Sequence, residues 1–117
     1  MNQFVLIFRM DIISEEAQPT PEQMQVYMEQ WMAWINDIES QGKLADGGNH
    51  LSKTGVVLRA NNVISDGPYV ANQESVAGYI IIYADDLTDA LKIARKCPIL
   101  VGEGTSVEVR EVGAPRE

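Results

Sequence analysis

The sequence predicts a single α+β domain over residues 1–117, in which two amphipathic helices cover one face of an antiparallel sheet. Three observations lead to this prediction. A chain of 117 residues supports one hydrophobic core and leaves no room for a second domain. Apolar residues recur at helical spacing in two segments, and strand-like apolar runs surround those segments. The resulting order of strand, helix, strands, strand, helix and strand is that of a split βαβ, or ferredoxin-like, unit.

The first two predicted elements are a buried strand and a long helix. Residues 3–8 are apolar on both faces, as in a central strand that is covered on both sides. Thr20 and Gln23 form a capping box, and Pro21 suits the first helical position. An apolar stripe at spacings of three and four then predicts one helix that stops at Gly42. The stripe consists of Met24, Tyr27, Met28, Trp31, Trp34, Ile35 and Ile38.

The middle of the chain divides into short pieces separated by turn residues. Turns are predicted at residues 47–49, 53–55, 61–62 and 66–69, and short strands at 56–58 and 63–64. Residues 76–83 then form the most apolar segment, and neither of its faces suits water. One face can pack on the helices. We expect the other to be covered by self-association in a homodimer with twofold symmetry.

The last third predicts a second helix and a final strand. Asp86 caps this helix, Pro98 ends it, and its inner face carries Leu87, Ala90, Leu91, Ala94 and Cys97. We interpret Cys97 as a small buried hydrophobe rather than a catalytic thiol. Residues 105–112 alternate as a strand with one wet face, and residues 113–117 are expected to fray.

Composition limits the classes of partner. The net charge of -8, from 9 Lys and Arg against 17 Asp and Glu, argues against a nucleic-acid partner. The chain comes closest to a basic cluster at Lys92, Arg95 and Lys96. These cations lie near the C-terminus of a predicted helix, where they offset the helix dipole.

The apolar run of residues 1–8 is too short to span a bilayer, so we expect no membrane partner and a cytoplasmic location. One His and one Cys exclude a typical zinc site, and the chain has no phosphate loop or dinucleotide fingerprint, so no metal or cofactor is expected.

Three short motifs carry a resemblance to a known family: the tetrapeptide Asp66-Gly67-Pro68-Tyr69, the helical segment 31–34, and Cys97-Pro98-Ile99. In order and spacing, residues 4–112 resemble the YCII-related family, whose DGPF subgroup is named for Asp-Gly-Pro-Phe, where this chain has Tyr69. The resemblance implies a ferredoxin-like, dimeric α+β barrel, a pocket between the sheet and the first helix, and a suspected enzymatic role. Some members of the family are proposed to use a His–Asp pair as general acid and base.

Asp66 and His50 are therefore the candidate catalytic residues. Asp66 matches the motif of the family directly, and His50 is the only histidine of the chain. An imidazole is the side chain whose ordinary pKa suits proton transfer near neutral pH, although His50 also fits a solvated loop position. Asp66 precedes Gly-Pro, where a carboxylate often accepts a hydrogen bond from its own turn, so a purely structural role is the alternative.

Five further residues are candidates for binding a substrate: Arg9, Tyr27, Trp31, Tyr79 and Glu74. Arg9 follows Val5 and Ile7 on one face of the first strand, and its guanidinium could bind a carboxylate ligand or pair with Asp66 or Glu74. The aromatic residues could line a pocket or belong to the core, and Glu74 could simply be solvated.

Two hypotheses of function follow. The first is a small, cofactor-independent, dimeric enzyme that performs acid/base chemistry, such as isomerisation, lactone chemistry or elimination, on a small anionic substrate. In it, Asp66 and His50 exchange the proton and Arg9 orients the substrate. The second hypothesis is a non-catalytic module that binds a small molecule or a regulatory partner through the same pocket.

Overall fold

The computed structural model describes residues 1–12, 14, 18–102 and 104–113, and it confirms the α+β, ferredoxin-like fold class. The elements, in chain order, are β1 (Asn2–Met10), α1 (Pro21–Ser40), β2 (Leu44–His50), β3 (Val56–Arg59), the 3-10 turn η2 (Ala60–Asn62), β4 (Val63–Asp66), β5 (Ser75–Ala84), α2 (Leu87–Ala94), the 3-10 turn η3 (Pro98–Val101) and β6 (Ser106–Glu111). Four strands form one antiparallel sheet in the order β2-β5-β1-β6, and β3 pairs only with β4.

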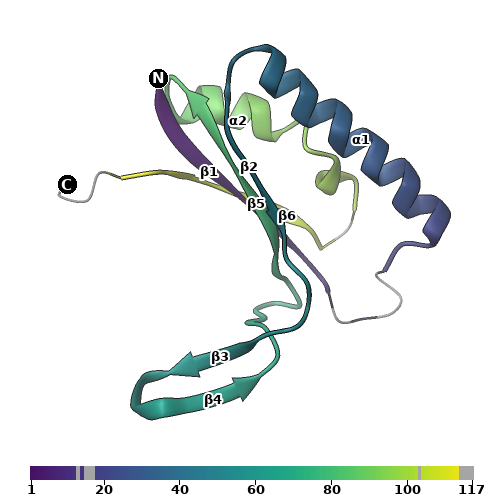
Figure 1. The fold of residues 1–117 in the computed structure, drawn as a ribbon, viewed down its shortest axis with the longest axis vertical. Coiled ribbons are helices and arrows are strands. Elements are labelled where there is room, and N and C mark those ends of the chain that lie inside the picture. Colours follow the sequence, from purple (N-terminus) through teal and green to yellow (C-terminus); the bar gives the residue numbers. More distant parts are fainter. Residues whose placement is uncertain (13, 15–17, 103, 114–117) are drawn as a thin grey trace.

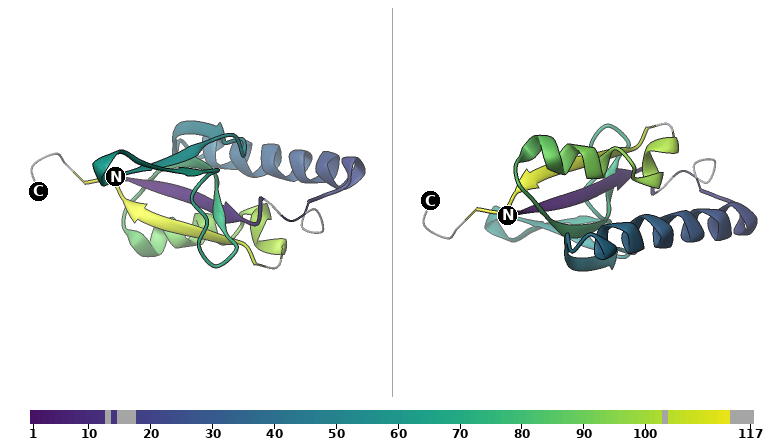
Figure 2. Two further views of the ribbon diagram at one scale, coloured as in Figure 1. Left: turned by 90° about the horizontal axis from the view of Figure 1, so that it is seen from below. Right: turned by 90° about the horizontal axis from the view of Figure 1, so that it is seen from above.

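Both helices lie on the same face of this sheet (Figure 1). Helix α1 runs over the β2 side and α2 over the β6 side (Figure 2). The core lies between these two layers, because alternate residues of the central strands point toward the helices. Its most buried members include Phe4, Leu6, Phe8, Trp34, Ile38, Ile80, Ile82 and Ala90. The helix-covered face of the sheet is therefore a sealed apolar core.

The predicted helix signals are confirmed. The Thr20 hydroxyl accepts a hydrogen bond from the Gln23 backbone N–H, and the Gln23 side-chain oxygen accepts one from the Thr20 backbone N–H, which completes the capping box. Helix α1 ends at Ser40, two residues before Gly42, whose φ of 71° lies in the left-handed region. The Asp86 carboxylate caps α2 by accepting a hydrogen bond from the Asp89 backbone N–H at 2.8 Å.

Two boundaries differ from the prediction. Helix α2 ends at Ala94, so Cys97 lies beyond it and Pro98 begins η3 instead of ending the helix. The predicted turn at residues 47–49 is wrong, because these residues lie within β2, whose pairing with β5 is irregular at two places. Gly48 has a φ of 61°, and a Cβ at this position would lie 1.6 Å from the carbonyl oxygen of Tyr79. A glycine-rich segment can thus form an edge strand by inserting bulges.

The hairpin of β3 and β4 projects beyond the end of the four-stranded sheet (Figure 1). Its strands confirm the predicted strands at 56–58 and 63–64. Asn61 and Asn62 connect them with φ values of 65° and 61°, as a tight hairpin turn requires. The strand predicted at 105–112 is observed as β6, and of the tail predicted to fray, residues 114–117 lie outside the described part of the chain.

Candidate functional site

The space between the sheet and α1 is filled by aromatic side chains. The Phe8 ring packs edge-on against Trp31 and Trp34, with centroid distances of 4.7 and 5.9 Å, and the two indole rings lie 5.4 Å apart. The Trp34 indole N–H donates to the backbone carbonyl of Ile93 at 3.1 Å. Trp31 therefore packs against the core, and the pocket that the family resemblance implied at this place is occupied by the protein itself.

Two recesses lie on the helix side. One, of about 460 Å³, lies between the C-terminal half of α1 and α2, and the other, of about 530 Å³, lies between α1 and η3. The first is lined by Trp34, Asp37, Ile38, Gln41, Lys43, Asp89, Lys92, Ile93, Arg95 and Lys96. None of the seven candidate site residues lines either recess. The candidate site must therefore be sought elsewhere on the described surface.

The opposite face of the sheet is covered by no described helix (Figure 1). We call it the open face. The strand register places on it Val5, Ile7 and Arg9 of β1, Val76, Tyr79, Ile81 and Tyr83 of β5, and Glu108 and Arg110 of β6. All of these except the more exposed Arg110 are half-buried, although no second layer covers them. The open face is thus an apolar surface with a charged cluster on β1 and β6.

Arg9 forms the centre of that charged cluster. Its Nη2 donates to Glu108 Oε1 at 2.8 Å, and Arg110 Nε lies 3.7 Å from Glu108 Oε2. The expectation of an Arg9 ion pair with Asp66 or Glu74 is therefore corrected, because the neighbouring strand β6 supplies the acid. Sequence reasoning did not single out Glu108, although the alternation of residues 105–112 placed it on the wet side of that strand.

Tyr79 lies beside Ile7 on the open face, since these two residues are cross-strand partners. Glu74 is not simply solvated, because its Oε1 accepts a hydrogen bond from Ser106 Oγ at 2.6 Å. Ser106 is the cross-strand partner of Arg9, so Glu74 lies at the edge of the same charged cluster. Tyr27, in contrast, is on α1, and its hydroxyl lies near Gly102 on the helix side.

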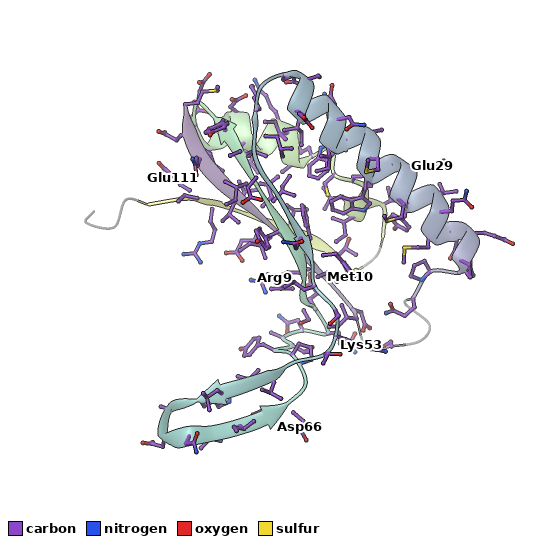
Figure 3. All side chains as sticks on the ribbon, viewed as in Figure 1. Arg9, Met10, Glu29, Lys53, Asp66 and Glu111 are labelled. Carbon is purple, nitrogen blue, oxygen red and sulfur yellow. The ribbon has the colours of Figure 1, made fainter. Side chains whose placement is uncertain are left out.

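The structure does not bring His50 and Asp66 together. His50 is exposed at the end of β2 and pairs with Gly78 of β5. Asp66 is exposed at the base of the projecting hairpin, whereas Arg9 lies on the sheet (Figure 3). Neither side chain forms a hydrogen bond or ion pair with the described residues, so the hydrogen bond expected between Asp66 and its own turn is not formed. One protomer alone does not assemble a His–Asp pair.

Cys97 belongs to the buried core, and burial raises the pKa of its thiol to about 12. A thiol with so high a pKa is protonated at neutral pH and is a poor nucleophile, which supports its interpretation as a small hydrophobe. Among the residues that the structure describes, no three His, Cys, Asp or Glu side chains are grouped as metal ligands. Within the same residues, no helix has the length and apolar character needed to cross a membrane.

Comparison with known proteins identifies the family but not a specific activity. No curated protein matches the chain significantly. The model of the YCII-related domain matches residues 5–113, which is nearly the whole chain and includes all seven candidate site residues. The chain therefore belongs to the YCII-related family.

Proposed function

We propose that this chain is a small-molecule-binding protein of its family, and that the open face binds an anion with an apolar body. The observation that carries this proposal is the position of Arg9, a guanidinium at the margin of an uncovered apolar sheet surface. None of the seven candidate residues lines either of the two helix-side recesses, although Arg95 and Lys96 line both.

The chemistry of the open face suits one class of ligand. A guanidinium has five N–H donors in a planar fork, and the contact with Glu108 engages Nη2 alone among the described residues. The remaining donors can bind a carboxylate or sulfonate by charge-assisted hydrogen bonds. Ile7 and Tyr79, next to Arg9 along the central strands, offer apolar area for the body of the ligand. The overall charge of -8 disfavours large polyanions, so the expected ligand is small and carries one acidic group.

A homodimer would complete this site. A band of apolar side chains runs along the two central strands and consists of Val5, Ile7, Val76 and Ile81. Exposure of such a band to water is unfavourable. Packing the open faces of two copies together would bury the band and enclose a ligand between two sheets. This arrangement is the dimeric α+β barrel that the sequence resemblance implies.

Binding of the fluorescent dye anilinonaphthalene sulfonate tests the proposal, because the dye combines an aromatic body with one sulfonate. We expect Arg9→Ala to weaken dye binding at least about ten-fold, since a charge-assisted hydrogen bond contributes about 1.5–3 kcal/mol. Lys96→Ala, which removes a cation from both helix-side recesses, is the matched control and should leave the affinity unchanged. Loss of binding in Lys96→Ala with normal binding in Arg9→Ala would contradict the proposal.

Acid/base catalysis is the second candidate function. It rests on the single imidazole of His50, which is exposed at the end of β2 and pairs with Gly78, the partner of Phe8, so the register places it on the helix-covered side of the sheet. The signals of this single imidazole can be followed by proton NMR across pH, in the wild type and in Asp66→Asn. A titration midpoint that moves in the variant would support a coupled His–Asp pair and an enzyme. An unmoved midpoint is the result that the binding function predicts, because the two side chains lie apart within one copy.

A further inference from the structure

The β3–β4 hairpin, residues 56–66, is the part of the described chain with the least packing against the rest. It extends away from the four-stranded sheet, on the side of the open face rather than that of the helices (Figures 1 and 3). No described helix or strand outside the hairpin makes more than a marginal contact with β3 or β4. A two-stranded hairpin without a covering layer is marginally stable in water. A partner surface would therefore stabilise the hairpin.

The two sides of the hairpin differ in character. The register pairs Leu58 with Ile64 and Val56 with Asp66, so three large apolar residues share one side. Their exposed fractions are 61% for Val56, 65% for Leu58 and 59% for Ile64. The other side carries Val57, Arg59, Val63 and Ser65 and is more polar. A contiguous apolar strip this exposed indicates a docking surface.

Charge indicates what the hairpin docks on. Within residues 56–66, Arg59 is the one cation and Asp66 the one acid, so the hairpin is neutral. The rest of the chain holds 8 of the 9 cations but 16 of the 17 acids. The neutral hairpin can therefore lie on a second copy of this chain without the repulsion that two acidic bodies meet, and its apolar strip matches the apolar band of the open face. The direction of the hairpin agrees, because it extends on the side where two open faces would meet.

We propose that each hairpin is an arm that docks its apolar side, formed by Val56, Leu58 and Ile64, on the open face of a second copy. Docking buries the strip on the arm together with part of the apolar band on the sheet. It also places Asp66, which shares that side of the arm, at the edge of the open face of the partner. The ligand site on that face rests on the proposed function, whereas the docking itself does not. The arm of each copy then covers part of the open face of the other.

Sedimentation equilibrium of a double variant, Leu58→Asp with Ile64→Asp, tests the arm. Two carboxylates in the docked strip should raise the dimer dissociation constant at least about a hundred-fold, as expected for centrally buried contacts. Val63→Asp, on the opposite side of the same hairpin, is the matched control and should change it by less than about three-fold. Because the arm projects from the body, circular dichroism should show an unchanged fold in both variants. An equal dimer dissociation constant in the double variant and the wild type would overturn the proposal.

Amide hydrogen exchange provides a second, independent measurement on the wild type. The amides of β3 and β4 should exchange rapidly in dilute protein and become protected as the concentration rises and the dimer forms. A chain that stays monomeric at millimolar concentration, or arm amides that exchange freely within the dimer, would overturn the docking. The dye titration distinguishes this failure from failure of the proposed function. If dye binding still depends on Arg9 while the arm does not dock, the ligand site stands without the arm.

Discussion

The two faces of the four-stranded sheet are made by the same strands but meet different surroundings. On β1, Phe4, Leu6 and Phe8 point to the helices and are buried. Val5, Ile7 and Arg9 alternate with them and reach the open face, where they are only half-buried. Both sets are mostly apolar, yet only the first is sealed within one copy of the chain. The comparison separates residues that hold the fold together from residues that are available for recognition.

The difference also indicates where polar groups are placed. On the helix-covered face, the Trp34 indole N–H bonds to a backbone carbonyl, so this polar group is satisfied internally. On the open face, Arg9 and Glu108 pair at the surface and keep donors and acceptors available to other molecules. Under the proposed function, the open face is therefore the side of the sheet that binds other molecules.

Substitution of neighbouring residues on β1 offers the strongest test of this comparison. Leu6→Ala should lower the free energy of unfolding by about 2–5 kcal/mol, because Leu6 is fully buried. Ile7→Ala removes as many carbon atoms from the open face and should cost only about 1 kcal/mol in dilute protein, because Ile7 is half-buried. Urea denaturation measures both values. Equal losses in dilute protein would remove the distinction between the faces.

Addition of a single methyl group to the bulged edge strand β2 should lower the stability of the protein. Gly48→Ala places a Cβ against the Tyr79 carbonyl at a positive φ, so it should cost about 1–3 kcal/mol of unfolding free energy. Gly47→Ala is the control, because its Cβ would meet no atom within 4 Å. Thermal denaturation of the two variants tests whether the close approach of the Gly48 backbone to the Tyr79 carbonyl fixes β2 against β5. Equal stability of the two variants would contradict it.

The helix-covered face should show a dependence on alkaline pH through Cys97. Burial raises the pKa of this thiol from 9.0 to about 12 in the folded protein, so the folded state holds the proton more tightly than the unfolded state. Its contribution to stability is then complete below about pH 9 and decreases as the pH rises from 9 toward 12. Urea denaturation of the wild type and Cys97→Ala across this range measures the contribution. If the difference in unfolding free energy between the wild type and Cys97→Ala stayed constant from pH 9 to 12, a buried, protonated thiol would be contradicted.

The smallest effect is expected at Asp66. Its carboxylate is exposed and forms no hydrogen bond to the described residues, so Asp66→Ala should change the unfolding free energy of dilute protein by less than about 0.5 kcal/mol. Urea denaturation provides the value. A loss of about 1 kcal/mol or more would instead support a turn held by this side chain.

Local signals in the sequence predicted much of the fold. The Thr20–Gln23 capping box, the Asp86 cap and Gly42 each act within a few residues, so their effects can be read without knowledge of tertiary contacts. The turn predicted at residues 47–49 is wrong because Gly-Gly-Asn is typical of turns. Here its backbone pairs with β5, a contact between residues about thirty positions apart that no local pattern reveals.

The candidate site could be predicted only in part, because contacts between side chains of different strands depend on the order of the strands in the sheet. The alternation of β1 correctly placed Arg9 on the face of Val5 and Ile7. Its partner Glu108 could be named only once β6 was known to pair with β1. The helical stripe identified Trp31 without deciding between core and pocket, and its packing on Phe8 decides for the core. The separation of His50 from Asp66 likewise followed from the projection of the hairpin.

The central claim is that the open face, rather than the helix side, binds small anions. Amide and indole NMR shifts during titration with anilinonaphthalene sulfonate test it most directly. We predict that the largest shifts occur at Ile7 and Arg9 of β1 and at Tyr79 of β5, with the Trp34 indole signal unchanged. Shifts confined to Trp34 and Lys96, in the recess between the helices, would contradict the claim.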